Sequence, residues 1–338
     1  MKKFLFSILL ILVVILADAQ NDTLIINKNT ILVGEIKDMD KGVLTFETAY
    51  SDSDFKIEWL TVTNIISNRD YRIILSDGTR LYGAIRTDTS DATIIIDDNK
   101  IGLVRTTPSA IIYLKHVSSG NIFDVINLSM DIGYTFTKAN SLHQLNSDIK
   151  GDYYSNIWGI KAYTNTVHNT QKDAVPTKRT NAGTGLKLFF KRDYFAAIDA
   201  DYFSNNEQNL NLRSNYNVSI GKYFIHTNHI YLNTSTGIAY SFENYNDTLT
   251  DRKSVEGKLG IELNMFDTGD LSFFTNLIFY PSITEKYRLR TTINLTSKYE
   301  LLNDFYIKLS LDYNYDTKPI DGIDPDDYVI STGIGWEL

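Results

Sequence analysis

Charged side chains of both signs recur at alternate positions through the last two thirds of the chain. Residues two apart in a β-strand lie on the same face, so these charges line one face of a series of predicted strands. If Arg213, Arg288 and Arg290 are unpaired, they form a cationic stripe that would pass anions. Because acidic and basic residues occur in comparable numbers, ion pairs that fill a narrow interior are the other interpretation. The candidate residues on this polar face are Asp131, Asp199, Asp201, Arg213, Glu256, Lys258, Glu262, Arg288, Arg290, Lys308 and Asp312.

Patterns that would bind a metal or a cofactor lack the required spacing. The acidic stretch from Asp316 to Asp327 offers carboxylates to calcium, but its ligands do not alternate as in an EF-hand loop, and we expect a solvated loop. Gly183 and Gly185 lack the third glycine and the helix of a dinucleotide fingerprint, and we expect them to be strand glycines facing the polar side. The chain has no cysteine, which excludes disulfides, thiolate nucleophiles and zinc–sulfur sites. The sequence therefore predicts no cofactor.

Strands must position these charges, and residues 121–338 alternate apolar and polar side chains throughout. We count about twelve strands, each near the roughly 9–11 residues that a tilted membrane strand needs. In a β-sandwich the apolar face packs inward, whereas in a membrane barrel it meets lipid and the polar face lines the lumen. Alternation alone fits both architectures.

The connections between strands favour the barrel. One end of the predicted sheet carries every long connection: Lys138–His143, His168–Lys178, Ser204–Asn209, Phe242–Lys253, Pro281–Lys286 and Asp316–Asp326. The connections at the other end are short: Tyr154–Asn156, Lys191–Asp193, Ile225–Asn228, Asp267–Asp270 and Glu300–Asp304. Outer-membrane barrels have short periplasmic turns and longer external loops. We therefore predict an all-β fold with an antiparallel transmembrane β-barrel over residues 121–338, whose lumen the candidate charges line.

Aromatic residues near the predicted strand ends fit the same interpretation, because barrels carry aromatic girdles at both interfaces. Those toward the long-loop end are Tyr134, Phe136, Tyr202, Tyr240, Phe279 and Tyr313, and those toward the other end are Phe190, Tyr194, Phe273, Phe305 and Trp336.

The N-terminus predicts export. Lys2 and Lys3 precede an apolar run that ends at Leu16, and small residues follow up to Ala19, which is typical of a cleaved signal peptide over residues 1–19. The run is shorter than the roughly 20 residues of a membrane helix. The absence of cysteine excludes a lipoprotein anchor, and the net charge of −8 argues against nucleic acid as a partner.

Residues 20–116 contain short predicted strands that form two copies of one unit, separated from the barrel at residues 116–121. The matched segments are Gly34–Ile36 with Gly83–Ile85, Leu44–Phe46 with Thr93–Ile95, and Ile57–Trp59 with Ile101–Leu103. From this spacing we predict a duplicated small SH3-like or Sm-like β-module in the periplasm. Trp59 and Tyr82 are expected in its core.

The last strand, Tyr328 to Leu338, places Ile330, Ile334 and Trp336 on one face and small or polar residues on the other. We expect it to pair with Phe305–Tyr315 and, to close the ring, with Ile126–Thr137. An export signal, a strand-rich N-terminal part and a barrel with this ending resemble the salt-induced outer-membrane protein family, domain of unknown function 481, over residues 123–338. The resemblance implies a fold and a location but carries over no site residues. Leu338 departs from the aromatic closing residue usual in such barrels.

These observations predict a non-enzymatic protein of the outer membrane of a Gram-negative-type bacterium. We expect a narrow solute pathway or a structural envelope component linked to osmotic or envelope stress. Its partners would be outer-membrane lipid and the barrel assembly machinery, with a possible periplasmic partner of residues 21–115.

Two alternatives remain open: a binding scaffold that acts through the periplasmic module, and a lipid-modifying barrel enzyme. Such an enzyme needs a histidine beside a nucleophile or a metal near the external rim, where only His143 and His168 fall. Because no Gly-x-Ser-x-Gly or His-Glu-x-x-His motif accompanies them, we predict no catalytic residues.

Overall fold

A computed structural model describes residues 22–27, 30–117, 126–138, 141–155, 157–245, 251–268, 270–301, 305–320, 322 and 324–336. The predicted signal peptide, most of the segment between the two predicted domains, and Glu337 and Leu338 lie outside the described residues. The fold is all-β, in two compact units whose main division lies between His116 and Val117, with the short segment Ile74–Arg80 grouped with the second unit. No helix in the described ranges is long and apolar enough to cross a membrane.

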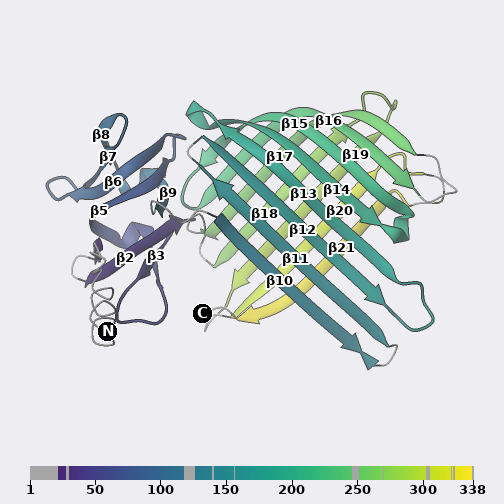
Figure 1. Ribbon diagram of the computed structural model, residues 1–338, viewed down its shortest axis with the longest axis horizontal. Helices are drawn as coiled ribbons and strands as arrows, with labels where there is room; N and C mark the ends of the chain where they lie inside the picture. Colours follow the sequence, from purple (N-terminus) through teal and green to yellow (C-terminus); the bar gives the residue numbers. More distant parts are fainter. Residues whose placement is uncertain are drawn as a thin grey trace, which may run out of the picture. The chain divides into compact units, whose positions relative to one another are not determined.

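The first unit is a nine-stranded antiparallel sheet. Its strands are β1 (Asp22–Ile26), β2 (Thr30–Asp40), β3 (Val43–Glu47), β4 (Phe55–Glu58), β5 (Val62–Leu75), β6 (Arg80–Asp88), β7 (Thr93–Asp98), β8 (Gly102–Thr106) and β9 (Ile111–His116). Strands β1 and β9 each pair with both β2 and β5, which closes a small ring of strands (Figure 1). Two meanders, β2–β3–β4 and β6–β7–β8, extend from that ring.

The duplication is visible in the connections and in the core of this unit. A short 3-10 turn follows each meander, η1 (Trp59–Thr61) before β5 and η2 (Pro108–Ala110) before β9. Trp59 is buried, as predicted, and its Nε1 donates to the Pro108 carbonyl at 2.7 Å, which ties the two turns together. Tyr82 is only partly buried.

Two of the predicted repeat matches need correction. Ile36 pairs with Phe46 and Ile85 pairs with Ile96, so Phe46 corresponds to Ile96 and the second match shifts by one residue. The third match is wrong: Ile57 and Trp59 are buried, whereas Ile101 and Leu103 are exposed on the edge strand β8. Similar residue types at similar spacing suggested the match, but sequence periodicity does not report which face of an edge strand is covered.

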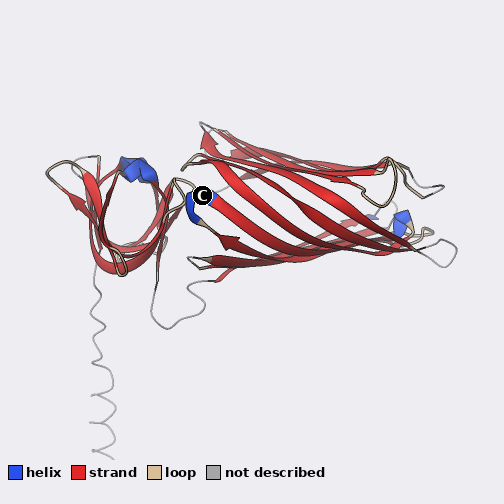
Figure 2. Cartoon of the chain, turned by 90° about the horizontal axis from the view of Figure 1, so that it is seen from above, coloured by secondary structure: helices blue, strands red, loops and turns tan. Residues whose placement is uncertain are grey.

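The second unit is a twelve-stranded antiparallel sheet in which each strand pairs with its sequence neighbour (Figure 1). Its strands are β10 (Ile126–Thr137), β11 (Leu142–Tyr154), β12 (Trp158–Thr170), β13 (Thr177–Phe189), β14 (Tyr194–Asn205), β15 (Leu210–His226), β16 (Ile230–Tyr245), β17 (Arg252–Thr268), β18 (Leu271–Pro281), β19 (Leu289–Glu300), β20 (Phe305–Asp316) and β21 (Asp326–Trp336). The sheet curls into a barrel-like tube (Figure 2).

The register keeps two distinct faces across all twelve strands. Ile198, Val218 and Ile238 lie side by side on β14, β15 and β16, and each is 58–60% exposed. On the opposite, concave face Glu243 and Glu256 are 0–1% exposed. The apolar face is thus the exposed one and the polar face the buried one, the reverse of a soluble sandwich, in which apolar side chains pack inward. The sandwich interpretation is therefore wrong.

Every connection of more than four residues lies at one end of the sheet, as the sequence predicts. Those at one end are residues 138–141, 171–176, 206–209, 246–251, 282–288 and 317–325, and those at the other are residues 155–157, 190–193, 227–229, 269–270 and 301–304. We call the first the long-loop end and the second the short-turn end. Strands β16 and β17 extend further toward the long-loop end than the alternation suggested, so their connection is shorter than predicted.

The last strand pairs with β20 as predicted, with Phe305 opposite Trp336 and Tyr313 opposite Tyr328. The predicted pairing with Ile126–Thr137 is not seen: within the described ranges β10 bonds only to β11, and β21 only to β20. The edges of these two strands are therefore unpaired, and side chains of both strands are exposed on both faces.

Candidate functional site

The concave face of the twelve-stranded sheet holds the predicted charges, and its curvature brings together strands that are not neighbours. Side chains of β15 and β19, or of β14 and β17, meet there although two or more strands separate them. Such contacts require the strands to wrap around a narrow interior. The interior therefore contains polar side chains packed against one another at the long-loop end of strands β14–β19.

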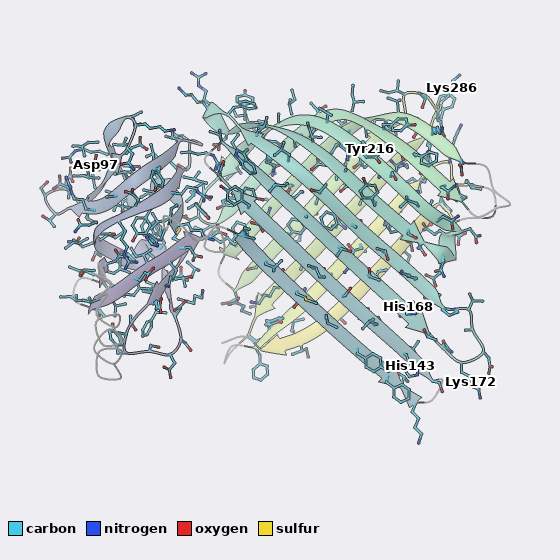
Figure 3. The ribbon with its side chains drawn as sticks, viewed as in Figure 1. Asp97, His143, His168, Lys172, Tyr216 and Lys286 are labelled. Carbon is cyan, nitrogen blue, oxygen red and sulfur yellow. The ribbon has the colours of Figure 1, made fainter. Side chains whose placement is uncertain are left out.

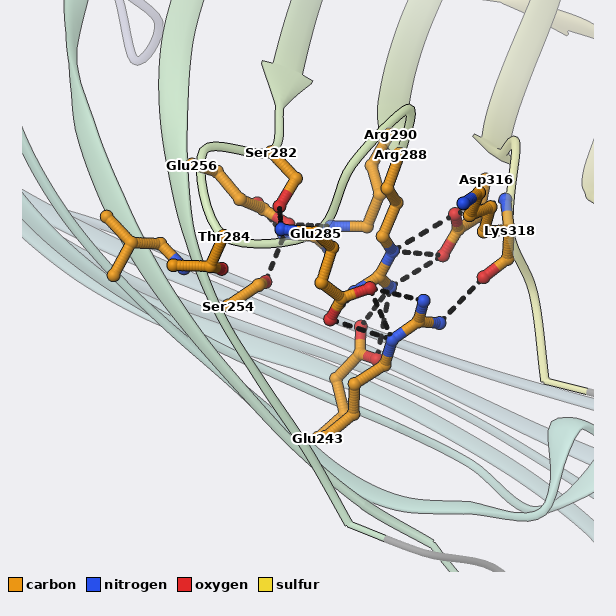
Figure 4. Close-up of polar contacts among 12 residues, drawn as sticks. Glu243, Ser254, Glu256, Ser282, Thr284, Glu285, Arg288, Arg290, Asp316 and Lys318 are labelled. Carbon is orange, nitrogen blue, oxygen red and sulfur yellow. Dashed lines mark hydrogen bonds and ion pairs between the residues drawn. The ribbon is translucent and has the colours of Figure 1, made fainter.

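Arg288, just before β19, is the centre of this interior (Figure 4). Its side chain is 0% exposed. Nη2 donates to Glu243 Oε1 at 3.0 Å and to Asp316 Oδ2 at 2.6 Å, and Nη1 lies 3.4 Å from Glu285 Oε1. Nε also donates to both Asp316 oxygens, at 3.1 and 3.0 Å. One guanidinium thus bridges carboxylates from β16, β20 and the 282–288 loop.

Two further arginines complete the same cluster. Arg213 Nε donates to Glu243 Oε1 at 2.8 Å, and the Tyr245 hydroxyl donates to Glu243 Oε2 at 3.0 Å. Arg252 forms a bidentate pair with Glu285 and donates from Nη1 to the Lys318 carbonyl at 2.6 Å. Buried charges are tolerated only when they are paired and hydrogen-bonded, and each of these groups meets that condition.

Arg290 forms a second ion pair deeper along the same strand. Its Nε and Nη2 donate to the two oxygens of Glu256 at 3.0 and 2.6 Å. Nη2 also donates to Asn215 Oδ1 at 3.2 Å, and the Tyr280 ring lies 5.1 Å from the guanidinium carbon. Because Glu256 is fully buried, this bidentate pair has no aqueous competitor.

A third group lies toward the middle of β14. The Tyr163 hydroxyl donates to Asp201 Oδ1 at 2.9 Å, and Lys258 Nζ donates to Asp199 Oδ2 at 3.3 Å. Gly183 and Gly185 on the neighbouring strand make room for these carboxylates. A Cβ at either position would lie 2.5–2.6 Å from an aspartate oxygen. They are strand glycines facing the interior, as predicted.

A small cavity of about 90 Å³ remains beside this third group. Its charged lining residues are Lys161, Lys187, Asp199, Lys258 and Glu262. Lys187 Nζ donates to the Tyr223 hydroxyl at 3.3 Å and lies 4.5 Å from the Phe195 ring centre. The space suits a few water molecules, because one water needs a share of about 30 Å³.

The structure places the predicted charges in two groups. Asp199, Asp201, Arg213, Glu256, Lys258, Glu262, Arg288 and Arg290 lie in or beside the clusters described above. Asp131, Lys308 and Asp312 share the concave face of β10 and β20 but lie apart from these clusters; Asp312 accepts from Asn294 Nδ2 at 2.6 Å. The interpretation of Arg213, Arg288 and Arg290 as an unpaired cationic stripe is wrong, because all three are paired with carboxylates.

The sequence interpretation missed four charged members of the clusters. Glu243, Arg252, Glu285 and Asp316 fell within or at the edge of predicted loops, yet all four are partners of buried or partly buried charges. The alternation of faces along the strand could have identified Glu243. This residue takes the next inward position after Ala239 and Ser241. Asp316 takes part in the arginine cluster, so it does not belong to a purely solvated acidic loop.

The two candidate histidines lie on the convex face, away from the interior. His143 is opposite the outward Phe136 and its Nδ1 shares a hydrogen bond of 2.6 Å with the Tyr134 hydroxyl. His168 Nε2 shares one of 3.3 Å with Thr170 Oγ1. In the part of the chain that the structure describes, no group of His, Cys, Asp or Glu has the arrangement needed to hold a metal ion.

Buried ionisable groups of the first unit have structural roles. Asp22 is buried and accepts hydrogen bonds from the Ile36 amide at 2.8 Å, the Ser67 hydroxyl at 2.5 Å and the Tyr71 hydroxyl at 2.8 Å. Burial, and then the charge of Asp22, raise the pKa of Tyr71. Burial also opposes ionisation of Asp98, but backbone amide donors, first among them that of Tyr82, lower its pKa overall.

A family model described as protein of unknown function, DUF481, matches residues 130–337, which is more than half of the chain. The chain belongs to this family. The resemblance predicted from the last strand and the barrel pattern is thereby confirmed, and the first unit lies outside the matched residues. No curated protein matches the chain.

Among solved structures, CdiB from Acinetobacter baumannii matches with 11% identity and a TM-score of 0.24. The match covers 80% of this chain and 60% of the CdiB chain, so the chain spans less than two thirds of that structure.

Proposed function

We propose that the protein is a non-enzymatic outer-membrane β-barrel with its long-loop end outside the cell and its N-terminal unit in the periplasm. The observation that carries the proposal is the inverted burial of the twelve-stranded sheet. Leucine, isoleucine, valine and aromatic side chains cover its convex face, while carboxylates and guanidinium groups are buried on the concave face. Water would penalise such an exposed apolar surface, whereas the hydrocarbon core of a bilayer covers it.

The predicted aromatic girdles support the same location. Tyr134, Tyr202, Tyr240 and Phe279 all lie on the convex face, as the register shows, and Phe273 and Phe305 lie on it toward the short-turn end. Aromatic rings of this kind sit at the headgroup level of membranes.

We further propose that the barrel is a structural component of the envelope rather than an open diffusion pore. The fully buried Arg288, held by Glu243, Asp316 and Glu285, fills the interior at the long-loop end of β16–β20. A solute would have to break these charge-assisted bonds in order to pass that part of the interior. A narrow pathway beside the exposed Asp131 and Lys308 is the remaining route for small ions.

Fractionation and electrical recording test this proposal together. We expect the full-length protein in the outer-membrane fraction, with folded and heated forms that migrate differently on a gel. In planar bilayers the wild type should give little conductance, and Arg288→Ala should give larger or more frequent openings. Lys222→Gln, on the convex face at the short-turn end, is the matched control and should behave as wild type. Recovery in the soluble periplasm would contradict the location, and a large steady wild-type conductance would contradict the filled interior.

The arrangement of the first unit supports a finer proposal for the periplasmic part. In each copy a meander leads through a 3-10 turn into the strand that closes the sheet, as in small SH3-like barrels. We propose two fused SH3-like barrels that share the long strand β5. Such barrels present loops to protein or peptide partners, so a periplasmic partner for residues 21–115 follows as part of this proposal.

For the enzyme alternative, the placement of His143 and His168 on the convex face gives no support. Their hydrogen-bond partners in the described structure are the hydroxyls of Tyr134 and Thr170, and neither histidine has the carboxylate partner that would orient a catalytic base. We therefore expect cells that carry His143→Gln and His168→Gln to keep unchanged envelope lipids. A change in acylation or headgroup composition would overturn the non-enzymatic proposal.

A further inference from the structure

At the long-loop end of β11–β13 the convex face of the sheet carries a group of basic and imidazole side chains. His168 on β12 lies directly opposite Lys178 on β13, and Thr170 lies opposite His143 on β11. Lys172 follows in the connection between β12 and β13. We call these five residues, His143, His168, Thr170, Lys172 and Lys178, the rim patch. Figure 3 shows His143, His168 and Lys172 together at this end.

The spacing of the rim patch suits one compact anion. Directly opposed residues of an antiparallel pair have Cβ atoms about 4.5–5.5 Å apart, and diagonal neighbours about 7–8 Å. His168 is directly opposite Lys178 and diagonal to His143. Donors from three adjacent strands can therefore reach the oxygens of a single phosphate group.

The cations of the rim patch are available. Lys172 and Lys178 are exposed, and within the described residues no carboxylate lies within ion-pair distance of either. Elsewhere at the long-loop end Arg252 and Arg288 are paired in the interior, and Lys318 Nζ donates to the Lys286 carbonyl at 2.7 Å. Lys253 and Lys286 each lie over an aromatic ring, at 5.3 and 4.8 Å from the ring centre. An accessible cationic patch on a chain of net charge −8 would attract an anionic ligand.

The surroundings of the patch identify the kind of anion. On the same convex face Leu145 lies directly opposite His168, and Tyr134 on β10 lies opposite Leu145. The next outward residues on β12 and β13 are Thr166 and Thr180. Leu145 is 45% exposed and Tyr134 is 63% exposed. Cations beside exposed apolar side chains match a molecule with an anionic head and hydrocarbon chains, whereas a free anion would make no contact with those side chains.

We propose that the rim patch binds the phosphate group of a lipid headgroup in the outer leaflet, with the acyl chains on the apolar face below. This inference rests on the proposed function, because only that orientation puts the long-loop end at the outer leaflet. Lys178 and His168 contact the phosphate directly, and Lys172 and His143 border it.

The test measures binding of a diphosphorylated glucosamine-disaccharide lipid to the full-length protein in detergent, against the dephosphorylated lipid with the same acyl chains. We expect the phosphorylated lipid to bind more tightly. Lys178→Gln should weaken its binding about fivefold, the contribution typical of one basic residue near an anionic lipid surface, and His168→Gln with Lys178→Gln should weaken it further. Lys178→Arg should retain binding.

The matched control is Lys222→Gln, which removes a convex-face lysine at the opposite end of the strands, where its Nζ lies 4.9 Å from the Tyr194 ring centre. Its affinity should equal that of the wild type. Equal binding of the two lipids, or an equal loss in the control, would overturn the proposal. Displacement of the lipid by inorganic phosphate at a similar concentration would assign the patch to a free anion and overturn the lipid assignment.

Heat-modifiable migration of every variant reports whether the barrel is folded. Because the binding assay uses folded protein in detergent, its failure is distinguishable from failure of the membrane location, which fractionation reports separately.

Discussion

Replacing Arg288 with methionine removes the guanidinium that joins three carboxylates in the barrel interior. The methionine side chain keeps the unbranched apolar stem but ends where the guanidinium begins, so the change deletes the charge and its donors. Removal of one partner from a buried ion pair costs about 3–5 kcal/mol, because the other charge stays buried without compensation.

The structure decides where in that range the loss falls. Glu243 keeps Arg213 and the Tyr245 hydroxyl, and Glu285 keeps Arg252. Asp316 keeps only the Lys318 amide, at 2.9 Å, among the contacts described for it within the cluster. Because one carboxylate rather than three is left largely unpaired, we expect the free energy of unfolding to fall by an amount near the lower limit, about 3 kcal/mol.

A second substitution separates this cause from lost packing. In Arg288→Met with Asp316→Asn, the stranded charge is gone, so the loss should shrink to about 1–2 kcal/mol, the cost of neutral hydrogen bonds. Lys308→Met is the matched control, since Lys308 lies on the same face of β20 as Asp316 but is exposed. We expect it to leave stability unchanged.

The assay is urea unfolding of the full-length protein refolded into lipid vesicles, followed by tryptophan fluorescence. The midpoint should fall for Arg288→Met at an unchanged slope, which is the mark of altered stability without altered compactness. A loss below about 1 kcal/mol, or a double variant as unstable as the single one, would refute the reasoning that the buried carboxylate drives the effect.

Three further predictions concern the first unit. Gly83→Ala would place a Cβ 1.8 Å from the Asp97 carbonyl oxygen, and we expect faster amide hydrogen exchange in β6 and β7 and a loss of about 2 kcal/mol or more; unchanged exchange would contradict the close approach. Tyr71→Phe removes one of three donors to the buried Asp22, for an expected loss of about 1–2 kcal/mol in a denaturant titration, and a stabilised variant would count against that network. Burial, and then a neighbouring guanidinium, lower the pKa of His116, so the folded state holds its proton less tightly than the unfolded chain. Stability should therefore fall as the pH drops below about 6.5, and His116→Gln should lack that part of the dependence; identical profiles would remove His116 as its source.

The fold of the second unit was largely predictable from the sequence, because a period of two directly encodes which residues share a face. The twelve strands, their neighbour-to-neighbour pairing and the sorting of connections follow from that period. The burial of each face does not follow, since alternation is the same in a sandwich and in a barrel. Only the curvature of the sheet, seen in contacts such as Arg290 with Asn215, decides it.

The membership of the site was predictable in part, but its pairing was not. Arg213, Arg288 and Arg290 were all identified, yet their partners depend on which strands face one another across the interior. Glu285 reaches Arg252 because the 282–288 loop folds back, and no local pattern encodes that path. In the first unit, Ile101 and Leu103 misled the repeat alignment for a similar reason, as their exposure depends on β8 being an edge.

The unpaired edges of β10 and β21 have a consequence for how the barrel forms. All pairings seen in this unit join strands that follow each other, so each hairpin closes a short loop at low entropic cost and the sheet can grow quickly from many starting points. Within the described ranges β10 and β21 do not pair with each other, so each keeps an open strand edge. Open edges can pair with other chains, so the yield of refolding should fall with rising protein concentration.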